Sequence, residues 1–471
     1  MTKPTVPSKG MQSYACAIHG PITFPGSVPK NDHNQGLDAF VKALINTEEV
    51  QRLRWIRQNG LSHLIFNTME HSRFTHSLGV AFVARRMIDR ILLNSSLSPE
   101  DHPEVWGWKY ETVAAAILHD IGHGPFSHSF EEILRAINPD LPKDQEFDHE
   151  DMTLRMIREN TQVNQALKDC KQDLPERVAQ FFVKKEERKD HWRYRIVSSQ
   201  LDADRLDYIL RDAQMAGLRG VGFDLDRILQ HLYVGNLNDP YFVLDRKAIE
   251  ALESALLAND QLYRAVYYHR KVRAATAMLQ TLLLRAANLA KDNHENSLKL
   301  FKRQDHPLLQ LMSDGKTVDL KAYLSLTENH IWALIEEWRN YPDKILSDYA
   351  RRLWSRDLHC AEEIHGHDEG VKQEKKALQK LVNTNYLELQ KEELAQYYVL
   401  PDTSRRKSYK EGDSIYLGDQ NKKDEKPSTL EFDHSSRIVY MLREQHKIEY
   451  VIYPHTDQSN QSSDLSTKAD G

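Results

Sequence analysis

The adjacent pair His119-Asp120, at the end of an apolar stretch, constrains this chain more than any other feature of its sequence. The stretch VAAAIL runs almost directly into the pair, which predicts that the backbone carrying it is a buried helix. Gly122, Gly124 and Pro125 follow and end that helix, because proline clashes with the preceding turn and glycine tolerates a redirected backbone. We therefore expect His119 and Asp120 to stand near the C-terminal end of a buried helix, directed at one point.

Histidine followed by aspartate supplies two ligand types that suit a divalent cation. A neutral imidazole nitrogen and an ionised carboxylate oxygen bind borderline-hard divalent ions without any thiolate. His76 lies earlier in the chain and Asp204 lies in the segment LDADRLDYILRD. Each belongs to one of the motifs quoted below, and on that motif context the candidate metal ligands number four: His76, His119, Asp120 and Asp204. Four protein ligands leave positions open on a six-coordinate ion for water and a phosphate oxygen. We expect one divalent ion per site, whether Mn, Mg, Fe, Zn or Ni.

Composition narrows the classes of protein that this chain can be. Its 471 residues allow a sizeable core with appendages, and its net charge of −6 gives no overall attraction to nucleic acid, so a nucleic-acid partner is not favoured. The three cysteines (Cys16, Cys170 and Cys360) are odd in number and widely spaced, which argues against a disulfide framework. With no long apolar stretch and no apolar segment at the N-terminus, we expect a cytoplasmic protein without a membrane partner.

The hydrophobic periodicity is mostly helical. Helical patterns cover residues 37–45, 49–58, 74–93, 111–121, 126–137, 196–213, 225–232 and 246–292. Strand-like sequence is sparse until residues 397–400, 414–417 and 448–453, with a helix after Ser435. We therefore expect a mainly α fold with a small α+β C-terminal module at 395–455, between a flexible N-terminus (1–14) and a disordered polar tail (456–471).

Six motifs occur in one order between about residues 15 and 280. After Ile18-His19-Gly20 come INTEEVQRLRWIRQNG, EHSRFTHSLG, HDIGHGPFSHSFE, His149-Glu150, DADRLDYILRD and LYRAVYYHRKV. In this combination the chain resembles the HD-domain phosphohydrolases, and within them the deoxynucleoside triphosphate triphosphohydrolases that include bacterial dGTPases and the eukaryotic SAM-and-HD-domain protein. The resemblance implies an HD-type helical core at 15–292, followed by a helical extension at 293–394.

Proton transfer in such a site needs groups that titrate near neutrality. The candidate catalytic residues are His123, His128, His149 and Glu131. Glu131 could orient one of the histidines, as an acidic residue there does in the resembled family. Which of the three histidines protonates a leaving group stays open at the level of sequence.

The chain has no glycine-rich phosphate loop, so a triphosphate must be held by metal and side chains. The resemblance implies these substrate-binding residues: Gln58, Arg73, Arg205, Tyr208, Asp212 and Tyr267. Arg205 replaces a lysine of the eukaryotic relative, which keeps the charge and adds a bidentate fork. Asn259 stands where that relative has an arginine. The resemblance also implies that Tyr267 packs on the deoxyribose.

The resemblance further implies regulation by nucleotides. Gln51, Arg52 and Arg54 preserve part of an allosteric nucleotide site, whereas Asn46 replaces an acidic residue that reads the base. A homo-oligomer, tetramer or hexamer, and a nucleotide activator are the corresponding expectations.

The favoured function is that of a metal-dependent enzyme that cleaves a dNTP, with dGTP favoured, to a deoxynucleoside and tripolyphosphate. Its role would lie in control of dNTP pools or in antiviral or antiphage defence. Two alternatives stay open: a phosphodiesterase or nuclease that acts on cyclic or oligomeric nucleotides, and a catalytically silent nucleotide sensor. The sensor is the less favoured of these, because each position expected to bind the metal holds a residue that can do so.

Overall fold

The computed structural model describes residues 12–24, 36–97, 102–137, 142, 146–292, 299–302, 306–314, 317–409, 413–422, 425–430 and 436–455. Of the N-terminal segment expected to be flexible, only 12–14 are described, and Tyr14 begins strand β1 (Tyr14–Cys16), which pairs with β2 (Gly20–Ile22). The tail at 456–471, predicted to be disordered, lies outside the described residues.

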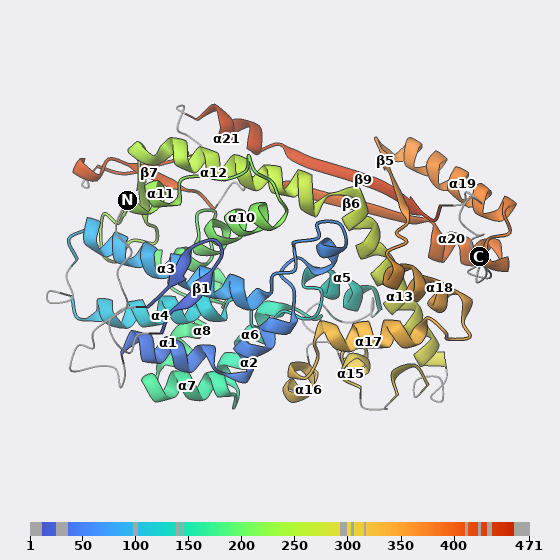
Figure 1. The fold of residues 1–471 in the computed structure, drawn as a ribbon. Helices are drawn as coiled ribbons and strands as arrows, with labels where there is room; N and C mark the ends of the chain where they lie inside the picture. Colours follow the sequence, from blue (N-terminus) through green and yellow to red (C-terminus); the bar gives the residue numbers. More distant parts are fainter. Residues whose placement is uncertain are drawn as a thin grey trace, which may run out of the picture.

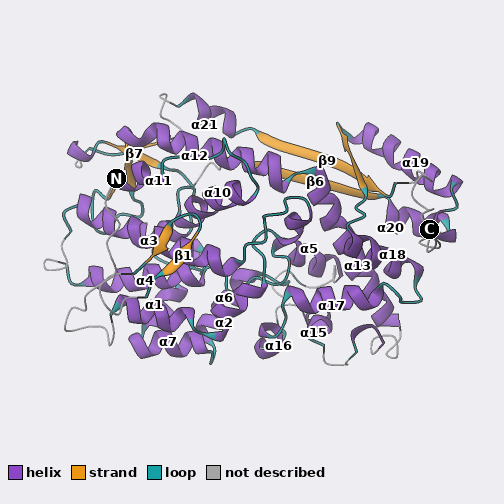
Figure 2. Cartoon of the chain, viewed as in Figure 1, coloured by secondary structure: helices purple, strands orange, loops and turns teal. Residues whose placement is uncertain are grey.

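The described chain is mainly helical, as predicted, with small sheets (Figures 1 and 2). Its N-terminal helices surround the residues of the candidate site. They are α1 (Leu37–Ile45), α2 (Glu48–Arg52), α3 (Arg73–Asn94), α4 (Glu104–Leu118), α5 (His128–Ile137), α6 (His149–Arg158), α7 (Gln162–Cys170), α8 (Leu174–Ala179), α9 (Trp192–Val197), α10 (Ala203–Met215), α11 (Leu225–Gln230), α12 (Ile249–Leu262) and α13 (Arg270–Asp292). The later helices are α15 (Pro307–Asp314), α16 (Leu320–Leu324), α17 (Glu328–Trp338), α18 (Lys344–Ser355), α19 (His367–Asn383), α20 (Lys391–Tyr398) and α21 (Arg437–Leu442).

Helix α4 carries the apolar stretch that precedes the His-Asp pair. Every residue from Val113 to Leu118 is at most 1% exposed, because α4 packs against α3 on one side and against α1, α8 and α9 on others. The sequence predicts a helix to residue 121, but α4 ends at Leu118 and His119 is its C-cap. The pair therefore stands where a fully buried helix meets the loop that follows.

The long helical pattern at 246–292 is interrupted in the structure. After α12 the chain makes a π-helical turn at Tyr263–Tyr267, and α13 begins at Arg270. A prediction from periodicity alone was wrong about continuity here, because the residues on both sides of the interruption keep helical spacing. Single-turn π segments occur frequently at functional sites. This one carries Tyr263 and Tyr267, which both line the cavity described below.

One sheet joins the C-terminal part to the rest of the chain, and a second sheet lies within the C-terminal part. A four-stranded sheet has the order β3 (Leu232–Tyr233), β4 (Val243–Asp245), β7 (Tyr416–Gly418) and β8 (Ser428–Thr429), with β4 and β7 parallel and Val243 opposite Tyr416. A three-stranded antiparallel sheet has the order β5 (Cys360–Ile364), β9 (Gln445–Tyr453) and β6 (Leu400–Lys407). Tyr397 and Tyr398, predicted as strand, instead end helix α20, and β6 begins two residues later.

None of the described helices is long and apolar enough to cross a membrane.

Candidate metal and catalytic site

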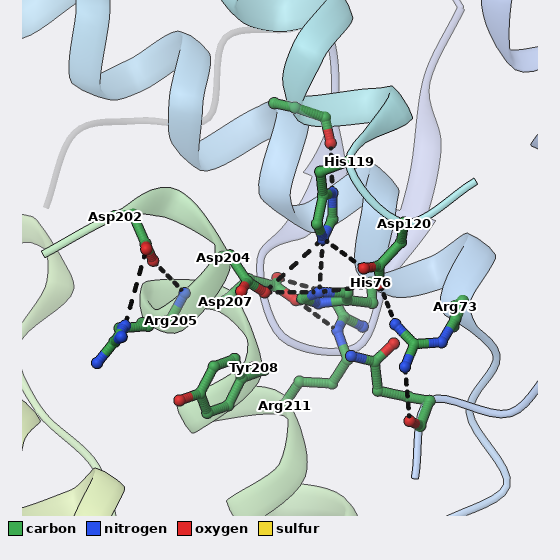
Figure 3. Close-up of polar contacts among 12 residues, drawn as sticks. Arg73, His76, His119, Asp120, Asp202, Asp204, Arg205, Asp207, Tyr208 and Arg211 are labelled. Carbon is green, nitrogen blue, oxygen red and sulfur yellow. Dashed lines mark hydrogen bonds and ion pairs between the residues drawn. The ribbon is translucent and has the colours of Figure 1, made fainter. Parts of the chain in front are cut away.

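The four candidate metal ligands converge from three helices (Figure 3). His76 comes from α3, Asp204 from α10, and His119 and Asp120 from the end of α4. His76 Nε2 lies 2.9 Å from Asp204 Oδ1 and 3.3 Å from His119 Nε2, and His119 Nε2 lies 3.3 Å from Asp120 Oδ1. Ligand atoms held about 2.1 Å from one ion are separated by about 3.0 to 3.4 Å. The ligand atoms of His76, His119 and Asp204 therefore lie close enough together for a single divalent ion, and Asp120 adjoins this group.

The imidazole tautomers leave the right nitrogens available for such an ion. His119 Nδ1 lies 2.9 Å from the Ala116 carbonyl oxygen, which can only accept, so Nδ1 donates and the Nε2 lone pair faces the other ligands. His76 Nδ1 lies 2.8 Å from Asp207 Oδ2, which directs its Nε2 to the same point. Metal-binding histidines are usually oriented by hydrogen bonds of this kind.

The charges around the cluster favour a cation at its centre. Burial by itself would lower the pKa of His76, but the hydrogen bonds to Asp204 and Asp207 raise it to about 10. Burial would raise the pKa of Asp120, yet the charges of Arg73, His119 and His123 hold it well below its usual range. The carboxylates thus stay ionised in a buried place, and the donor set of two imidazoles and two carboxylates suits a divalent metal.

Asp207 belongs to this site, although it is not among the predicted metal ligands, catalytic residues or substrate-binding residues. It is fully buried and accepts from His76, from His19 Nε2 at 2.7 Å, and from Arg211 Nε and Nη2 at 2.8 Å each. Its carboxylate therefore holds one metal ligand in place. The signal in the sequence was its spacing, since residues three apart on a helix share a face and Asp207 follows Asp204 by three. Gly79 of α3 completes the contact, because a Cβ there would collide with the Asp207 and Arg211 side chains.

The loop after the His-Asp pair has an unusual backbone. Phe126 and Ser127 both have positive φ, 60° and 58°, a conformation that costs free energy for residues other than glycine and often occurs at functional sites. Ser127 Oγ accepts a hydrogen bond from Arg73 Nε at 2.9 Å, and the other side of the Arg73 guanidinium contacts Asp120. Arg73 is buried and therefore fixes Asp120 and this loop relative to α3.

A second cluster lies beside the first and contains all four predicted catalytic residues. The rings of His123 and His149 are stacked, with centroids 3.9 Å apart, and His149 Nδ1 lies 2.8 Å from Glu131 Oε1. His123 Nε2 is 3.4 Å from Asp120 Oδ1, which connects the two clusters. His128 is largely exposed and approaches Glu131 to 3.7 Å.

The two stacked histidines have opposite protonation preferences. Burial and the charges of Arg73 and His149 hold the pKa of His123 well below its ordinary value. Burial would also lower the pKa of His149, but its hydrogen bond to Glu131 and the nearby carboxylates raise it. His149 is therefore the member of the pair that keeps a proton to higher pH, while His123 stays neutral.

Both clusters open into one cavity of about 1120 Å³. Every predicted substrate-binding residue lines it, namely Gln58, Arg73, Arg205, Tyr208, Asp212 and Tyr267. Gln58 Oε1 is buried without a hydrogen-bond partner among the described residues, so this acceptor is available to a ligand.

Two tyrosines that line the cavity are held by an acidic and an amide group. Tyr267 donates to Asp212, whose other oxygen lies 2.8 Å from His71 Nε2. Tyr208 donates to Asn259 Oδ1 at 2.9 Å, so the neutral residue at position 259 orients an aromatic ring. Sequence reasoning missed His71, which belongs to the motif EHSRFTHSLG but lies outside its predicted ligands.

The three residues expected in an allosteric site point in different directions. Arg52 is buried and donates to the carbonyl oxygens of His123 at 2.9 Å and Leu326 at 3.2 Å. Arg54 is exposed, lies 3.6 Å over the Phe74 ring and donates to Gln51 Oε1 at 2.8 Å. Within this chain, Arg52 supports the loop that follows the His-Asp pair, and Gln51 and Arg54 are the accessible members.

Comparisons with known proteins agree with this geometry. Residues 73–210 match the HD domain family, and residues 223–332 match the family described as HD associated region. An uncharacterized protein of Bacillus subtilis, YwfO, is 35% identical over 332 residues, which make up 70% of this chain and 70% of that protein. A Dictyostelium discoideum homolog of deoxynucleoside triphosphate triphosphohydrolase SAMHD1 is 26% identical over 389 residues, 80% of this chain and 71% of that protein. The crystal structure of a phosphohydrolase from Bacteroides thetaiotaomicron matches with a TM-score of 0.75 and 25% identity, over 94% of this chain and 100% of that one.

Proposed function

Because the chain belongs to the HD-domain phosphohydrolases, which are metal-dependent hydrolases, we propose that it hydrolyses deoxynucleoside triphosphates to deoxynucleoside and tripolyphosphate, with dGTP favoured. One observation carries the proposal. The metal-ligand cluster, the stacked histidines, the cationic side chains and the Tyr267 ring all line a single cavity. The relative named as a deoxynucleoside triphosphate triphosphohydrolase supports this choice of substrate.

His76, His119, Asp120 and Asp204 would hold the divalent ion. When bound there, such an ion lowers the pKa of a water molecule and polarises a phosphoryl group. Proton transfer and substrate binding are assigned to side chains of this chain.

Proton transfer is assigned to the second cluster. Hydrolysis at the α-phosphorus adds water to phosphorus and breaks the bond to the 5′ oxygen, which must take up a proton as it leaves. His149 keeps its proton because Glu131 accepts from its other ring nitrogen, so it is the proposed general acid. His123, which is buried and neutral, stacks on His149 and keeps the ring in place.

Substrate binding is assigned to other side chains that line the cavity. Arg205 would contact the triphosphate as a charge-assisted donor, and Tyr208 beside it would donate or pack. Tyr267, held by Asp212, would pack on the sugar and disfavour a 2′-hydroxyl. Gln58 has a buried unpaired oxygen that can accept from the sugar.

The product distinguishes this function from its alternatives. Purified full-length protein would be incubated with single dNTPs and with pairs of them, in Mn²⁺ or Mg²⁺, and the products separated by chromatography. Tripolyphosphate should appear in a one-to-one ratio with deoxynucleoside. Orthophosphate or pyrophosphate with a nucleotide product would mean that another bond is cut, and inertness toward every nucleotide would favour the sensor.

Regulation by nucleotide is proposed for the accessible side of α2. Gln51 and Arg54 are available to a nucleotide bound between subunits of a tetramer or hexamer, and Arg52 connects this helix to the carbonyl of His123. The particle mass in solution, measured by light scattering with and without each dNTP, tests this. A mass unchanged by nucleotides, together with activity that rises hyperbolically with one dNTP alone, would argue against activation through assembly.

A further inference from the structure

Strand β6, from the C-terminal part of the chain, forms one side of the catalytic cavity. Arg405, Arg406 and Lys407 at its end all line the cavity, although they are far from the metal ligands in sequence. Figure 1 shows β6 running beside β9 between α20 and the side of the molecule that holds α10 and α12. The strand therefore brings cations to a cavity whose candidate metal ligands and histidine cluster come from the N-terminal half.

The end of β6 has a fixed position against α12. Ser408 Oγ donates to Asp260 Oδ1 at 2.6 Å, and both residues are buried. His446, which lies opposite Arg406 on β9, approaches the same carboxylate oxygen to 3.8 Å. These contacts anchor the strand beside the π-helical turn, which follows directly after α12.

Arg406 is the cation of β6 that this packing directs inward. Its guanidinium carbon lies 3.0 Å from the centroid of the Tyr263 ring, so the ring supports the group by a cation–π contact. Its Nη1 is buried and has no hydrogen-bond partner among the described residues. A buried donor without a partner costs free energy, which a bound acceptor would recover.

The other buried or half-buried guanidinium groups of the cavity have protein partners. Arg73 contacts Asp120, Arg195 lies 2.9 Å from Asp413, and Arg273 lies 2.9 Å from Asp402. Arg406 forms no ion pair with a carboxylate among the described residues; Tyr208, Arg205 and Asp260 are the groups near enough to shift its pKa. Burial and the charge of Arg205 lower the pKa of Arg406 to about 10, so it is still a cation at neutral pH. Arg205 lies 3.7 Å from Asp202, whereas Arg406 has no ion-pair partner among the described residues, so the two guanidinium groups carry more positive charge than the carboxylate beside them offsets. Such an excess of positive charge suits an anion.

We propose that Arg406 binds the polyphosphate of the substrate together with Arg205, so that the C-terminal strand β6 supplies part of the triphosphate site. The choice of a nucleoside triphosphate as ligand rests on the proposed function; the anion-binding role rests on the geometry of Arg406 itself. Because Arg406 stacks on Tyr263, the planar guanidinium matters as well as its charge, and lysine should replace it only in part.

Binding of inorganic tripolyphosphate to the full-length protein tests the anion-binding role without turnover. Titration calorimetry would compare the wild type with Arg406→Ala and with Lys447→Ala, which removes one positive charge from the neighbouring strand outside the cavity lining. Arg406→Ala should weaken tripolyphosphate binding by about 10- to 150-fold, as expected for a lost charge-assisted hydrogen bond, and Lys447→Ala should leave it unchanged. Deoxyguanosine, which has no phosphate, should bind equally to all three proteins.

Melting temperatures without ligand show whether each variant is folded. Should Arg406→Ala unfold, Arg406→Gln, which keeps most of the stacked side chain, takes its place and should show the same selective loss. Equal tripolyphosphate binding by wild type and variant overturns the inference, and so does failure of the wild type to bind tripolyphosphate at all.

Kinetics separate failure of this inference from failure of the proposed function. If the wild type hydrolyses dNTPs and the Arg406 variant does so with the same KM and kcat, the inference is wrong and the proposed function stands. If the variant loses tripolyphosphate binding while even the wild type hydrolyses no dNTP, the anion site stands and the proposed function is wrong.

Discussion

At the scale of single residues, one carboxylate decides how the metal ligands face each other. Asp207 accepts from His76 Nδ1 and is itself held by Arg211 and His19, so the His76 ring has one orientation and one useful nitrogen. Asp204 lies one turn before Asp207 on α10, and its Oδ1 is 2.9 Å from His76 Nε2. The two acids on α10 thus occupy separate positions: Asp204 faces the candidate metal site, and Asp207 orients the candidate ligand His76.

Replacement of Asp204 by asparagine should remove bound metal with little effect on the fold. The amide keeps the shape of the side chain but lacks the charge that a divalent ion requires. We expect metal content, measured by mass spectrometry of the purified protein, to fall to near zero and hydrolysis to fall with it. Asp226→Asn, a change of the same kind at an exposed carboxylate of α11, should alter neither. Full metal content in Asp204→Asn would show that the ion is held elsewhere.

The His149–Glu131 pair predicts a pH effect. Burial lowers the pKa of His149, whereas Glu131 raises it, and the balance lies above the ordinary value. A general acid works in its protonated form, so activity is present below this pKa and is lost as pH rises through it. Glu131→Gln removes the carboxylate charge and should move the alkaline limb of kcat/KM to lower pH. A limb that does not move in the variant would assign the proton donor to another group.

At the scale of elements, helix α2 supports the loop that follows the His-Asp pair. Arg52 donates to the carbonyl oxygens of His123 and Leu326, and its guanidinium lies 4.7 Å over the ring of Tyr323. Tyr323, from α16, donates to the carbonyl oxygen of Gly122 at 2.6 Å. Helices from two parts of the chain therefore satisfy the backbone of the loop that follows the His-Asp pair.

Arg52→Met should destabilise the protein and reduce catalysis together. Two buried carbonyl oxygens lose a donor, and each unsatisfied group costs about 1–3 kcal/mol. Thermal unfolding monitored by circular dichroism should show a clear drop in Tm. Arg54→Met, at an exposed position two residues later, should change stability by no more than about 0.5 kcal/mol. Similar melting temperatures for both variants would mean that Arg52 does not hold the loop.

At the scale of the whole molecule, cationic side chains gather around the cavity although the chain as a whole is negatively charged. The chain carries a net charge of −6, yet Arg73, Arg205 and Arg406 line the same cavity. Such a distribution suits a small anion that enters the cavity better than a polymer that contacts many phosphates across a surface. The pairing of β4 with β7 and the hydrogen bond from Ser408 to Asp260 hold the C-terminal part beside the elements that form this cavity.

Single-stranded DNA should therefore compete poorly with dGTP. A polymer bound through several phosphates loses affinity by about 0.7 log unit per contact for each log unit of salt. We expect a short single-stranded DNA to escape degradation and to inhibit dGTP hydrolysis weakly at physiological salt. Efficient degradation of that DNA by a protein inert toward every dNTP would replace the triphosphohydrolase with the phosphodiesterase alternative.

The sequence by itself determined the elements and residue types that local patterns specify. Helical periodicity predicted the mainly α fold, and the apolar run before His119 predicted a buried helix that ends at the site. The proximity of His76, His119, Asp120 and Asp204 was also expected, but through resemblance to a family, since no local pattern relates segments so far apart. The structure brings all four together.

Tertiary structure alone decided what depends on packing between distant segments. The break at Tyr263–Tyr267 is invisible to periodicity, because both sides keep helical spacing. The inward direction of Arg52 and the outward direction of Arg54 depend on what packs against α2. Arg406 reached the cavity only because β6 pairs with β9 and is anchored to α12, and nothing in the local sequence RRKSY distinguishes it from its neighbours. Periodicity reports which face of an element is buried, whereas a site depends on which elements meet there.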